Sequence, residues 1–576
     1  MRRSVGAVLL TLVLSFATSA IAAELPDYLP TETIAAIGVE GLGQHEAKAQ
    51  PFIDEWNRLN LSELLEAAFA DQAEEELPDV AMPDFDFDAD LLDFLGREAW
   101  VVVSASSFNP LPAVTLLARV TTEGMAAVTG ILDSFDSEGE VTTMSEGGIE
   151  FNVIIPSGDE AMVPAVAYAT FEDVVLVSSN PDVARGVLRR YQGANEPSLA
   201  TNTGFQATVG AVQPGNSYFY LDLAAGTEVA APFAAGMDFD ALVARVSAAA
   251  TTAGVYGVVT RIGEDGITSE TTRVLGDRSG DPLLYDAMAG GAPVSDGVLS
   301  FTPPTALGVT ATSTDISGWW DWLGDVVASE PSIGITDLSE MIEMSVGLDP
   351  DTTLFAWMGE EFGTITLGYG TASAMPTQLE NPLGDSVYLI ETTDEAAADA
   401  GLTQLFSLLA GFSSSFMDPM GEGAAVTPER RDVSGVSVTD WTLTDGFTLS
   451  TAVTGGYALV ATTPESMDAV LAARAGGAGL SNALAPLVQR VPQGARSFAL
   501  SNDQAALAFA NESLVDQFGM MSGMMGGDID FDAVEAATSA LGEFLEFATE
   551  RFGSTVGYTQ VNGQVVRGQS FSSVTW

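Results

Sequence analysis

The chain has 576 residues, of which 79 are Asp or Glu and 20 are Lys or Arg, so its formal net charge is -59. Because 47% of the residues are apolar, the chain can bury a substantial core, and this excludes wholesale disorder. There is no Cys, one His (His45) and one Lys (Lys48), which excludes disulfides, Cys nucleophiles, iron–sulfur clusters and Cys/His zinc sites.

Residues 1–22 have the pattern of an export signal. Arg2 and Arg3 form the charged start, residues 8–16 are apolar, and Ala20 and Ala22 place small side chains where a signal peptidase cleaves. The apolar run is too short for a comfortable membrane span, and no later stretch of about 20 residues is apolar and free of charge. We therefore expect an extracytoplasmic protein (periplasmic, cell-surface or secreted) with no transmembrane segment in the mature chain; an uncleaved anchor is the alternative.

The strong negative charge affects which partners and habitats suit the protein. It repels nucleic acid and anionic lipid head groups. The scarcity of Lys has two interpretations. One is a saline habitat, where salt screens the repulsion between carboxylates, and the other is a GC-rich genome that avoids Lys codons, with acids added for solubility.

Segments with the helical period of apolar residues occur along the whole chain, between strand-like segments. The predicted helices span residues 51–76, 122–136, 182–192, 240–251, 394–412, 465–474, 503–518 and 532–550. The strands do not alternate strictly with these helices, and several neighbouring strands have the pattern of hairpins. This favours an α+β fold, with antiparallel sheets and helices packed on one face, over a doubly wound parallel sheet.

Six motifs of the first half recur in the same order in the second half and indicate an internal duplication. The paired positions are Pro30/Pro304, Gly96/Gly359, Pro181/Pro464, Pro214/Pro492, Asp238/Asp530 and Gly266/Gly563. We therefore divide the mature chain into a first α+β repeat over residues 23–285 and a second over residues 286–576. Each repeat ends in a predicted hairpin, which we expect to close the sheet of its half.

Three short features together resemble a known family. They are the opening Leu29–Thr33 (LPTET), the Leu-x-x-Leu-Gly-x-Glu block Leu92–Glu98, and a later strand followed by Pro-Asp or Pro-Glu. The chain is similar in these features to an exported bacterial family known only as a domain of unknown function. The resemblance implies an envelope-associated protein and no catalytic residues. The second half departs from the pattern at Pro303, where the leading Leu is missing.

The sequence motifs of several enzyme classes are missing. Lys48 follows Ala47, so there is no Gly-Lys-Ser/Thr phosphate loop, and there is no Gly-x-Ser-x-Gly elbow or aspartic-protease motif. His45 has no nucleophile motif nearby, and we expect it to be a solvated loop residue rather than a general base. A glycosidase-like pair of carboxylates stays compatible with the composition, because it needs only two acids across a cleft.

Acids alternate along two segments, where they are weak candidate metal ligands. The candidates are Asp84, Asp86, Asp88, Asp528, Asp530 and Asp532. Alternate residues of an extended segment share one side, where their oxygens could gather around Ca²⁺. Neither segment fits an EF-hand loop, which needs Gly at its sixth position, where the sequence has Ala89 and Ala533. The competing interpretation, which we favour, is helix N-caps at Asp88 and Asp532.

Two apolar clusters have both a functional and a structural interpretation. The loop 517–527 is rich in Met, whose thioether sulfur binds Cu(I), but no His or Cys completes such a site. We favour a loop that packs or grips a partner. Trp319 and Trp322 fall on one face of a predicted helix, and we favour core packing there over an exposed platform for a sugar or a membrane interface.

These observations favour a non-catalytic envelope or secreted protein that binds a partner or acts as a scaffold. No cofactor is expected, and the partner is an unknown envelope protein, a glycan or an apolar ligand. One alternative is a carboxylate-dependent extracytoplasmic hydrolase, which would show two close carboxyls in a cleft, one with a raised pKa. The other is a carrier of an apolar ligand, which would need an unfilled apolar pocket.

Overall fold

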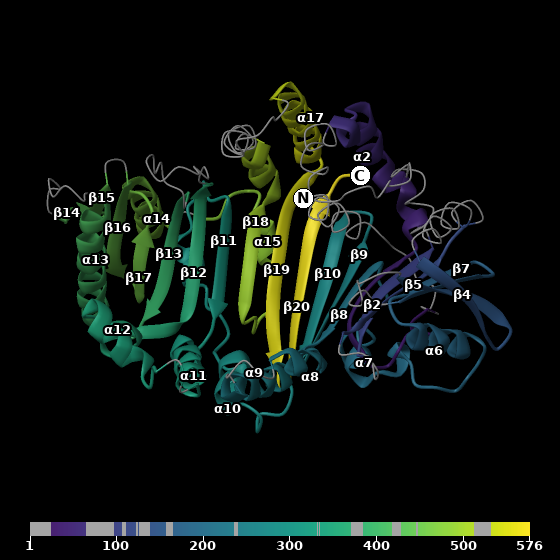
Figure 1. Cartoon of the computed structure of the whole chain (residues 1–576). Helices are drawn as coiled ribbons and strands as arrows, with labels where there is room; N and C mark the ends of the chain where they lie inside the picture. The colour runs from purple at the N-terminus through teal and green to yellow at the C-terminus, as the bar shows by residue number, and fades with distance from the viewer. Residues whose placement is uncertain are drawn as a thin grey trace.

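The structure is a computed structural model, shown in Figure 1. It describes residues 25–64, 97–105, 111–121, 125, 139–156, 165–234, 240–330, 332, 334–369, 384–417, 428–444, 447–477, 479–511 and 531–576. The predicted signal at residues 1–22, and all but one residue of the predicted helix 122–136, lie outside these ranges.

Among the described residues, the first half contributes ten strands. They are β1 (Thr33–Glu40), β2 (Glu98–Ser104), β3 (Ala113–Arg119), β4 (Gly139–Glu146), β5 (Ile149–Pro156), β6 (Val166–Phe171), β7 (Val174–Ser178), β8 (Ser217–Asp222), β9 (Val255–Ile262) and β10 (Gly266–Val274). The second half contributes another ten. They are β11 (Gly308–Ser313), β12 (Met358–Gly368), β13 (Asp385–Thr392), β14 (Glu429–Val433), β15 (Val436–Thr444), β16 (Phe447–Thr454), β17 (Tyr457–Ala461), β18 (Ser497–Asn502), β19 (Phe552–Asn562) and β20 (Val565–Val574).

The described α-helices lie between these strands along the chain. They are α2 (Glu46–Arg58), α6 (Pro181–Tyr191), α7 (Thr203–Thr208), α8 (Leu223–Ala234), α9 (Asp240–Ala253), α10 (Pro282–Ala289), α11 (Ile316–Ala328), α12 (Leu338–Val346), α13 (Glu395–Met417), α14 (Pro464–Gly476), α15 (Ala485–Val488) and α17 (Phe531–Thr549). Short turns of helix, η1 (Leu25–Asp27), η2 (Leu42–His45), η3 (Leu199–Thr201) and η4 (Val298–Phe301), and the π-helical turn η6 (Asp351–Phe355) complete the description.

The twenty strands form one antiparallel sheet, which confirms the α+β class. The hydrogen-bonded order in the first half is β4-β5-β6-β7-β3-β2-β1-β8-β9-β10. In the second half it is β14-β15-β16-β17-β13-β12-β11-β18-β19-β20. The second order repeats the first with matching strands ten numbers higher. An internal duplication would produce such a repeat; the duplication itself stays a prediction.

The two hairpins near Gly266 and Gly563 form the centre of this sheet and do not close two separate sheets. β10 pairs with β20 along its whole length, so each hairpin continues into the other half. A Cβ atom on Gly266 would lie 2.0 Å from the carbonyl oxygen of Ser572, so glycine permits the close approach of β20 there. At the other hairpin, Gly563 has a φ of 62° and opens the turn between Asn562 and Val565.

Each half has its main core on one face of the sheet, and the helices are not confined to that face. In the first half α6 and α7 cover Trp100 and Leu176, and in the second α14 and α15 cover Leu459. The neighbouring Ala458 points to the opposite face, because successive strand residues alternate. It packs with Phe406 of α13, so α13 covers the other face of the second half.

Several predicted helices agree closely with the structure, because the sequence marks their ends. α6 begins at Pro181 after Asn180, whose side chain accepts a hydrogen bond from the Asp182 amide (2.9 Å). α14 begins at Pro464 after the cap Thr463 in the same way. By contrast, α2 begins at Glu46, ahead of the predicted start at residue 51, and the predicted continuation beyond residue 64 lies outside the described residues.

Helices from the two halves pack against each other at both ends of the central strands (Figure 1). At one end, Phe52 of α2 lies edge-on to Phe547 of α17, with the ring centroids 5.4 Å apart. At the other end, α9 of the first half and α10 contact α11 of the second half. The halves are therefore held together by helices as well as by the β10–β20 pairing.

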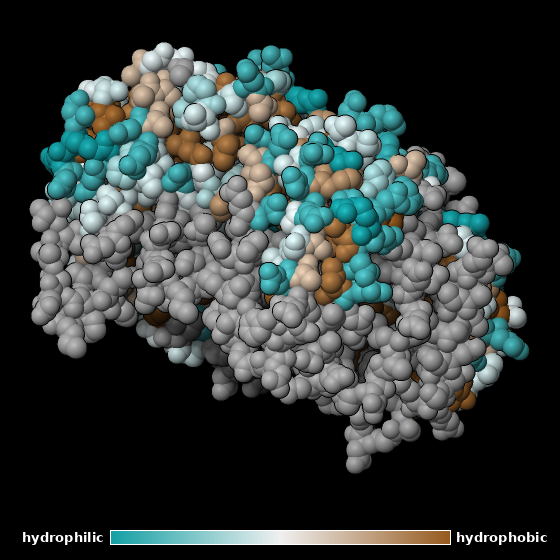
Figure 2. Space-filling model, turned by 90° about the horizontal axis from the view of Figure 1, so that it is seen from above, coloured by the Kyte–Doolittle hydropathy of each residue, from teal (hydrophilic) through white to brown (hydrophobic). Residues whose placement is uncertain are grey.

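The described surface seen from above is mostly hydrophilic, with apolar residues gathered in patches (Figure 2). Within the described ranges, no helix has the length and apolar character that a membrane span requires.

Candidate functional site

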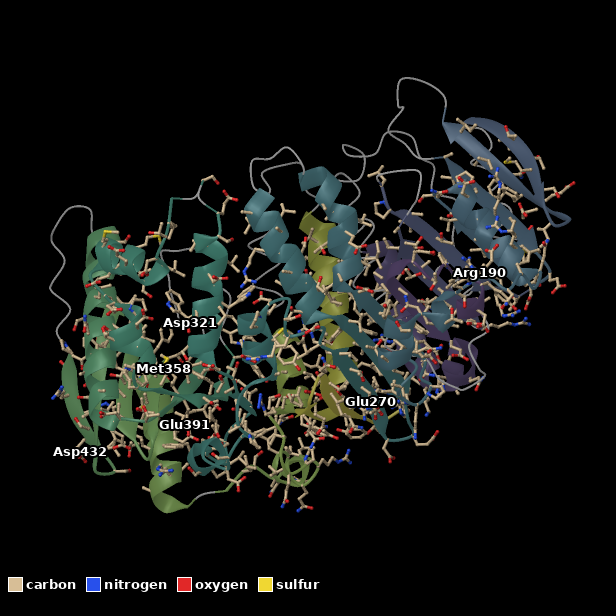
Figure 3. All side chains as sticks on the ribbon, turned by 90° about the horizontal axis from the view of Figure 1, so that it is seen from below. Arg190, Glu270, Asp321, Met358, Glu391 and Asp432 are labelled. Atoms are coloured by element: carbon tan, nitrogen blue, oxygen red, sulfur yellow. The ribbon has the colours of Figure 1, made fainter. Side chains whose placement is uncertain are left out.

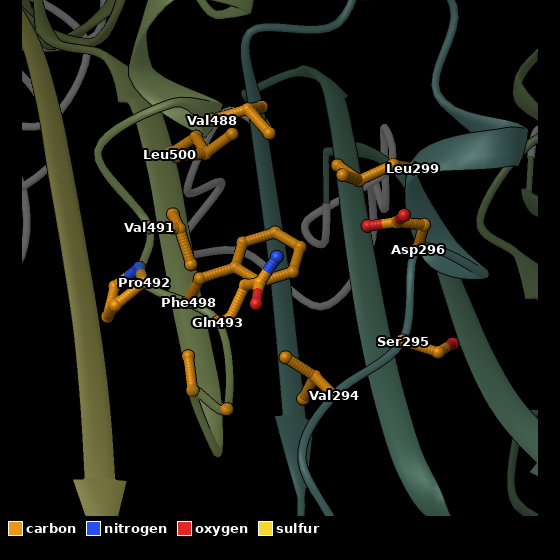
Figure 4. A pocket seen from close by; sticks show the side chains of 12 residues that line it. Val294, Ser295, Asp296, Leu299, Val488, Val491, Pro492, Gln493, Phe498 and Leu500 are labelled. Atoms are coloured by element: carbon orange, nitrogen blue, oxygen red, sulfur yellow. The ribbon is translucent and has the colours of Figure 1, made fainter.

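A cavity of about 230 Å³ lies in the second half, beside β18 (Figure 4). Phe498 and Leu500 of β18 are buried and form its floor. One wall is the segment 294–299 before and within η4, and the other is the segment 488–495 between α15 and β18. The lining residues are Val294, Ser295, Asp296, Leu299, Val488, Val491, Pro492, Gln493, Gly494, Ala495, Phe498 and Leu500. Its lining combines apolar side chains with polar groups, and such a combination occurs in binding sites for small molecules.

Hydrogen bonds fix both walls of the cavity. The amide of Val294 donates to the carbonyl of Ala495 (2.9 Å) and so joins the walls. The amide of Ser295 donates to Oε2 of the buried Glu361 (2.6 Å), whose Oε1 accepts from the Tyr457 hydroxyl (2.7 Å). Burial raises the pKa of Tyr457 and the carboxylate of Glu361 raises it further, so the phenol stays protonated and donates.

Glu391 of β13 supports the same region from the next strand (Figure 3). Its Oε2 accepts hydrogen bonds from the backbone amides of Glu360 and Glu361, each at 3.1 Å. The Glu360 side chain in turn accepts from the amide of Ala292 (2.8 Å). The chain that enters the cavity wall is therefore held by the buried Glu361 and the exposed Glu360, whose backbone amides are in turn held by the half-buried Glu391.

The strand ladders of the two halves can be aligned residue by residue. In the first half, the backbone amide of Glu40 donates a hydrogen bond to the carbonyl of Asn216. In the second half, the backbone amide of Ser313 donates in the same way to the carbonyl of Arg496. This correspondence aligns the two ladders. It places three residues of the first half, Trp100, Gly38 and Tyr218, at the positions of Gly363, Ala311 and Phe498.

The indole of Trp100 fills the core of the first half. It is 1% exposed and stacks on Tyr218, with ring centroids 5.4 Å apart, and a Cβ atom on Gly38 would lie 2.6 Å from the ring. Gly363 has no side chain at the matching position of the second half, and the buried Val298 of η4 packs over it, since a Cβ atom on Gly363 would lie 2.6 Å from Val298. A valine therefore stands in the second core where an indole stands in the first, which gives this part of the second core less side-chain volume. Gly363 itself does not line the cavity.

The first half holds two buried carboxyls side by side, which is half of what the hydrolase alternative requires. Glu40 and Glu98 are paired on β1 and β2. The pKa of Glu98 is raised to about 7, because burial and the charge of Glu40 raise it by more than the hydrogen bond from the Leu25 amide lowers it. Trp100 Nε1 also donates to Glu98 (3.1 Å). Neither carboxyl lines the cavity. Glu98 accepts a hydrogen bond from the amide of Leu25, and Glu361 accepts one from the amide of Ser295 in the second half, so the two glutamates have the same structural role.

Glu98 makes the stability of the protein fall as the pH rises. The carboxyl keeps its proton up to a pH of about 7 in the folded chain, but ionises near 4.5 when unfolded. Its stabilising contribution is therefore complete below 4.5 and is lost as the pH rises through 7. With about 1.4 kcal/mol per pKa unit, the loss is about 3 kcal/mol. In urea unfolding, we expect the free energy of unfolding of the wild type to fall by about 3 kcal/mol more than that of Glu98→Gln between pH 4.5 and 8. Parallel curves for the two proteins would contradict this assignment.

The structure places few of the sequence-predicted ligands. The side chains of Asp84, Asp86, Asp88, Asp528, Asp530 and Asp532 and the loop 517–527 lie outside the described residues, although α17 includes the backbone of Asp532. Among the described side chains, no group of three or more His, Asp or Glu residues is arranged to hold a metal ion.

The prediction that His45 is a solvated loop residue was wrong. It ends η2 directly before α2, and both its ring nitrogens are buried without a hydrogen-bond partner in the described structure. Burial and the nearby Lys48 lower its pKa, which keeps the ring neutral. Lys48 donates to the carbonyl of Gly263 (2.8 Å) and pairs with Glu264 (3.0 Å), so this segment is packed on the β9–β10 hairpin.

Trp319 and Trp322 pack as predicted on one face of α11, but at an interface between helices. Their rings meet edge-on with centroids 5.8 Å apart, and both are half-buried. Trp322 Nε1 donates to Asp281 at the start of α10 (2.8 Å). Sequence reasoning missed the roles of Glu98 and Glu361. The contrast between Trp100 and Gly363 was visible in the matching segments, but its meaning depends on the strand register.

Comparison with known proteins gives a family but no activity. The family model described as "Protein of unknown function (DUF3352)" matches residues 70–485. No curated protein matches the chain. The solved "Structure of crystal form III of TP0453" is 10% identical, with a TM-score of 0.24, over 48% of this chain and 90% of that chain. The "Structure of crystal form I of TP0453" is 8% identical, with a TM-score of 0.22, over 47% and 88%. TM-scores this low do not indicate a shared overall fold.

Proposed function

The chain belongs to the DUF3352 family of proteins of unknown function, and we propose that this member is an exported, non-catalytic protein that binds a small apolar group in the cavity beside Phe498. The observation that carries the proposal is the cavity itself, which lies over the buried side chains of Phe498 and Leu500. The second core also has a smaller side chain, Val298 over Gly363, where the first core has Trp100. An unfilled space costs stability, so its retention suits a site that a ligand completes.

The size and lining of the cavity favour an apolar group with one polar end. A dry apolar cavity of roughly 150 Å³ is enough to bind benzene. Here the apolar side chains of Val488, Val491, Phe498 and Leu500 surround the interior, while Asp296 and Gln493 are exposed at the rim (Figure 4). A branched aliphatic or single aromatic group fits such a space, and a donor attached to it would meet the Asp296 carboxylate.

The hydrolase alternative is less well supported. The paired carboxyls Glu40 and Glu98 are both buried, and the described cavity lies in the other half of the chain. A general acid has to reach the substrate, either directly or through one water. A scaffold role with an unknown envelope protein or glycan stays compatible with the proposal, because the cavity could accept an apolar side chain of such a partner.

Binding of benzene tests the proposal directly. We expect saturating benzene to raise the thermal unfolding midpoint of the wild-type protein, since a ligand that binds the folded state stabilises it. Val491→Phe should fill the cavity and abolish this shift. Val212→Phe is the matched control, because Val212 precedes β8 as Val491 precedes β18, and it should leave the shift intact. Equal shifts in all three proteins, or no shift in the wild type, would refute the cavity as a binding site.

Native mass spectrometry of protein recovered from its host tests the rest of the proposal. A chain that begins at Ala23 or the next residue, with a co-purified small ligand, supports export and binding. An intact Met1 on cytoplasmic protein, or turnover of a glycan or ester panel by the ligand-free protein, would overturn them.

A further inference from the structure

The face of the first half's sheet opposite its main core carries a second buried cluster, which includes Val39 and Ala118, and beside it a partly exposed block of apolar side chains. Ile37, Val101 and Val114 are 39%, 41% and 47% exposed. Paired residues on antiparallel strands point to the same face, so Ile37 shares its face with its partners Val101 of β2 and Phe219 of β8. Val101 in turn pairs with Leu116 of β3, two residues from Val114. Phe219 and Leu116 are half-buried, and Leu116 also packs against the second cluster. We call these five residues the outer face.

The second half shows that the fold does not require apolar residues at these positions. Four outer-face residues, Ile37, Val101, Phe219 and Leu116, correspond to Thr310, Thr364, Ala499 and Tyr388. The corresponding strands pair in the same order with threonine or alanine at three of these positions, and only Tyr388, which is 39% exposed, keeps a large ring. Exposed apolar surface costs about 25 cal/mol per Å² in water, so an exposed block that the fold does not need points to a partner.

The structure restricts the chemistry of that partner. Each of β1, β2, β3 and β8 pairs with a strand on both sides, so a partner cannot add to this face as another strand. The outer-face side chains have, apart from their backbone, no hydrogen-bonding atom, so contact with them is apolar. Strands β1, β2 and β8 contain no Lys or Arg, the one Arg of β3, Arg119, is paired with Asp173 and Glu98, and the chain carries a net charge of -59. Positive charge beside the apolar contact is therefore favoured, and negative charge is repelled.

We propose that the outer face binds the apolar side of a basic amphipathic helix supplied by another protein. Such a helix presents apolar residues at positions i, i+3, i+4 and i+7, with Lys and Arg on its flanks. Its diameter of roughly 10 Å spans two rows of strand side chains, which lie about 7 Å apart. This proposal does not depend on the cavity, which lies in the other half.

A labelled Leu/Lys peptide with helical periodicity is a suitable probe, and a peptide of the same composition in scrambled order is its control. We measure binding by fluorescence anisotropy with the full mature chain at low salt. The variant Ile37→Thr/Val101→Thr copies Thr310 and Thr364 and is therefore compatible with the fold. We expect it to weaken the Kd at least tenfold. Val246→Thr, on the exposed surface of α9, should bind as the wild type does.

Several outcomes would overturn this proposal. Equal affinity of the double variant, equal affinity for the scrambled peptide, or no binding by the wild type would each show that the outer face does not recognise such a helix. A wild-type dimer in sedimentation that the double variant abolishes would identify the face as a contact between copies of this chain. If circular dichroism shows that the double variant is unfolded, Val114→Ser, which copies Ser386 of the second half, takes its place.

Discussion

Replacing Trp100 by alanine is expected to lower the free energy of unfolding by about 3–5 kcal/mol, as other buried Trp→Ala changes do. The indole is almost fully buried, stacks on Tyr218 and donates to Glu98 (3.1 Å). Its removal takes away these contacts and leaves a space that Gly38 cannot fill. Urea unfolding of the two proteins at constant pH measures the loss.

Two comparisons separate a cavity effect from a general loss of packing. Trp100→Phe keeps a ring over Gly38 and should cost less than the alanine variant. Benzene should stabilise Trp100→Ala more than the wild type, because the variant has a space in both halves. If Trp100→Ala lies within about 1 kcal/mol of the wild type, the indole is not the side chain that fills the first core.

The architecture of each half was largely predictable from the sequence, because local patterns determine it. Period-two apolar segments predicted the strands, and the Pro residues at 181 and 464 marked the starts of α6 and α14. The order of the recurring motifs matches the repeated strand order. Local patterns could not show that β10 pairs with β20. Each hairpin has two strands that could pair with a neighbour, and the sequence does not indicate which strand lies beside them.

The candidate site was less predictable than the fold. Glu98 and Glu361 are two among 79 acids, and nothing in their immediate neighbours marks them as buried. Their burial follows from the strand register, which places each beside the segment that enters its half. The matching segments already place Trp100 against Gly363, but that Val298 packs over this glycine and that the cavity lies beside Phe498 follow only from the folded arrangement. A single glycine in a strand-like segment has several explanations, of which missing volume is one.

Replacing Asp281 by alanine is expected to destabilise the protein by about 3–5 kcal/mol, because it leaves a partly buried Arg245 without its main partner. Asp281 is 0% exposed and lies at the N-cap of α10. It accepts hydrogen bonds from Arg245 of α9, from Trp322 of α11 (2.8 Å) and from the Leu284 amide (3.2 Å). The residue therefore links the first half, the connecting helix and the second half.

The same arginine offers a matched control. Arg245 Nη2 also pairs with Asp325 (2.8 Å), whose side chain is 55% exposed, and exposed ion pairs contribute little. Asp325→Ala should therefore cost less than about 1 kcal/mol in the same urea titration. Burial opposes ionisation of Asp281, but the hydrogen bonds from Arg245 and Trp322 outweigh it and lower its pKa. The stabilisation is thus lost as the pH falls through this lowered pKa, and the Asp281→Ala deficit should shrink in strong acid. Equal losses for the two variants would contradict a buried link between the halves at Asp281.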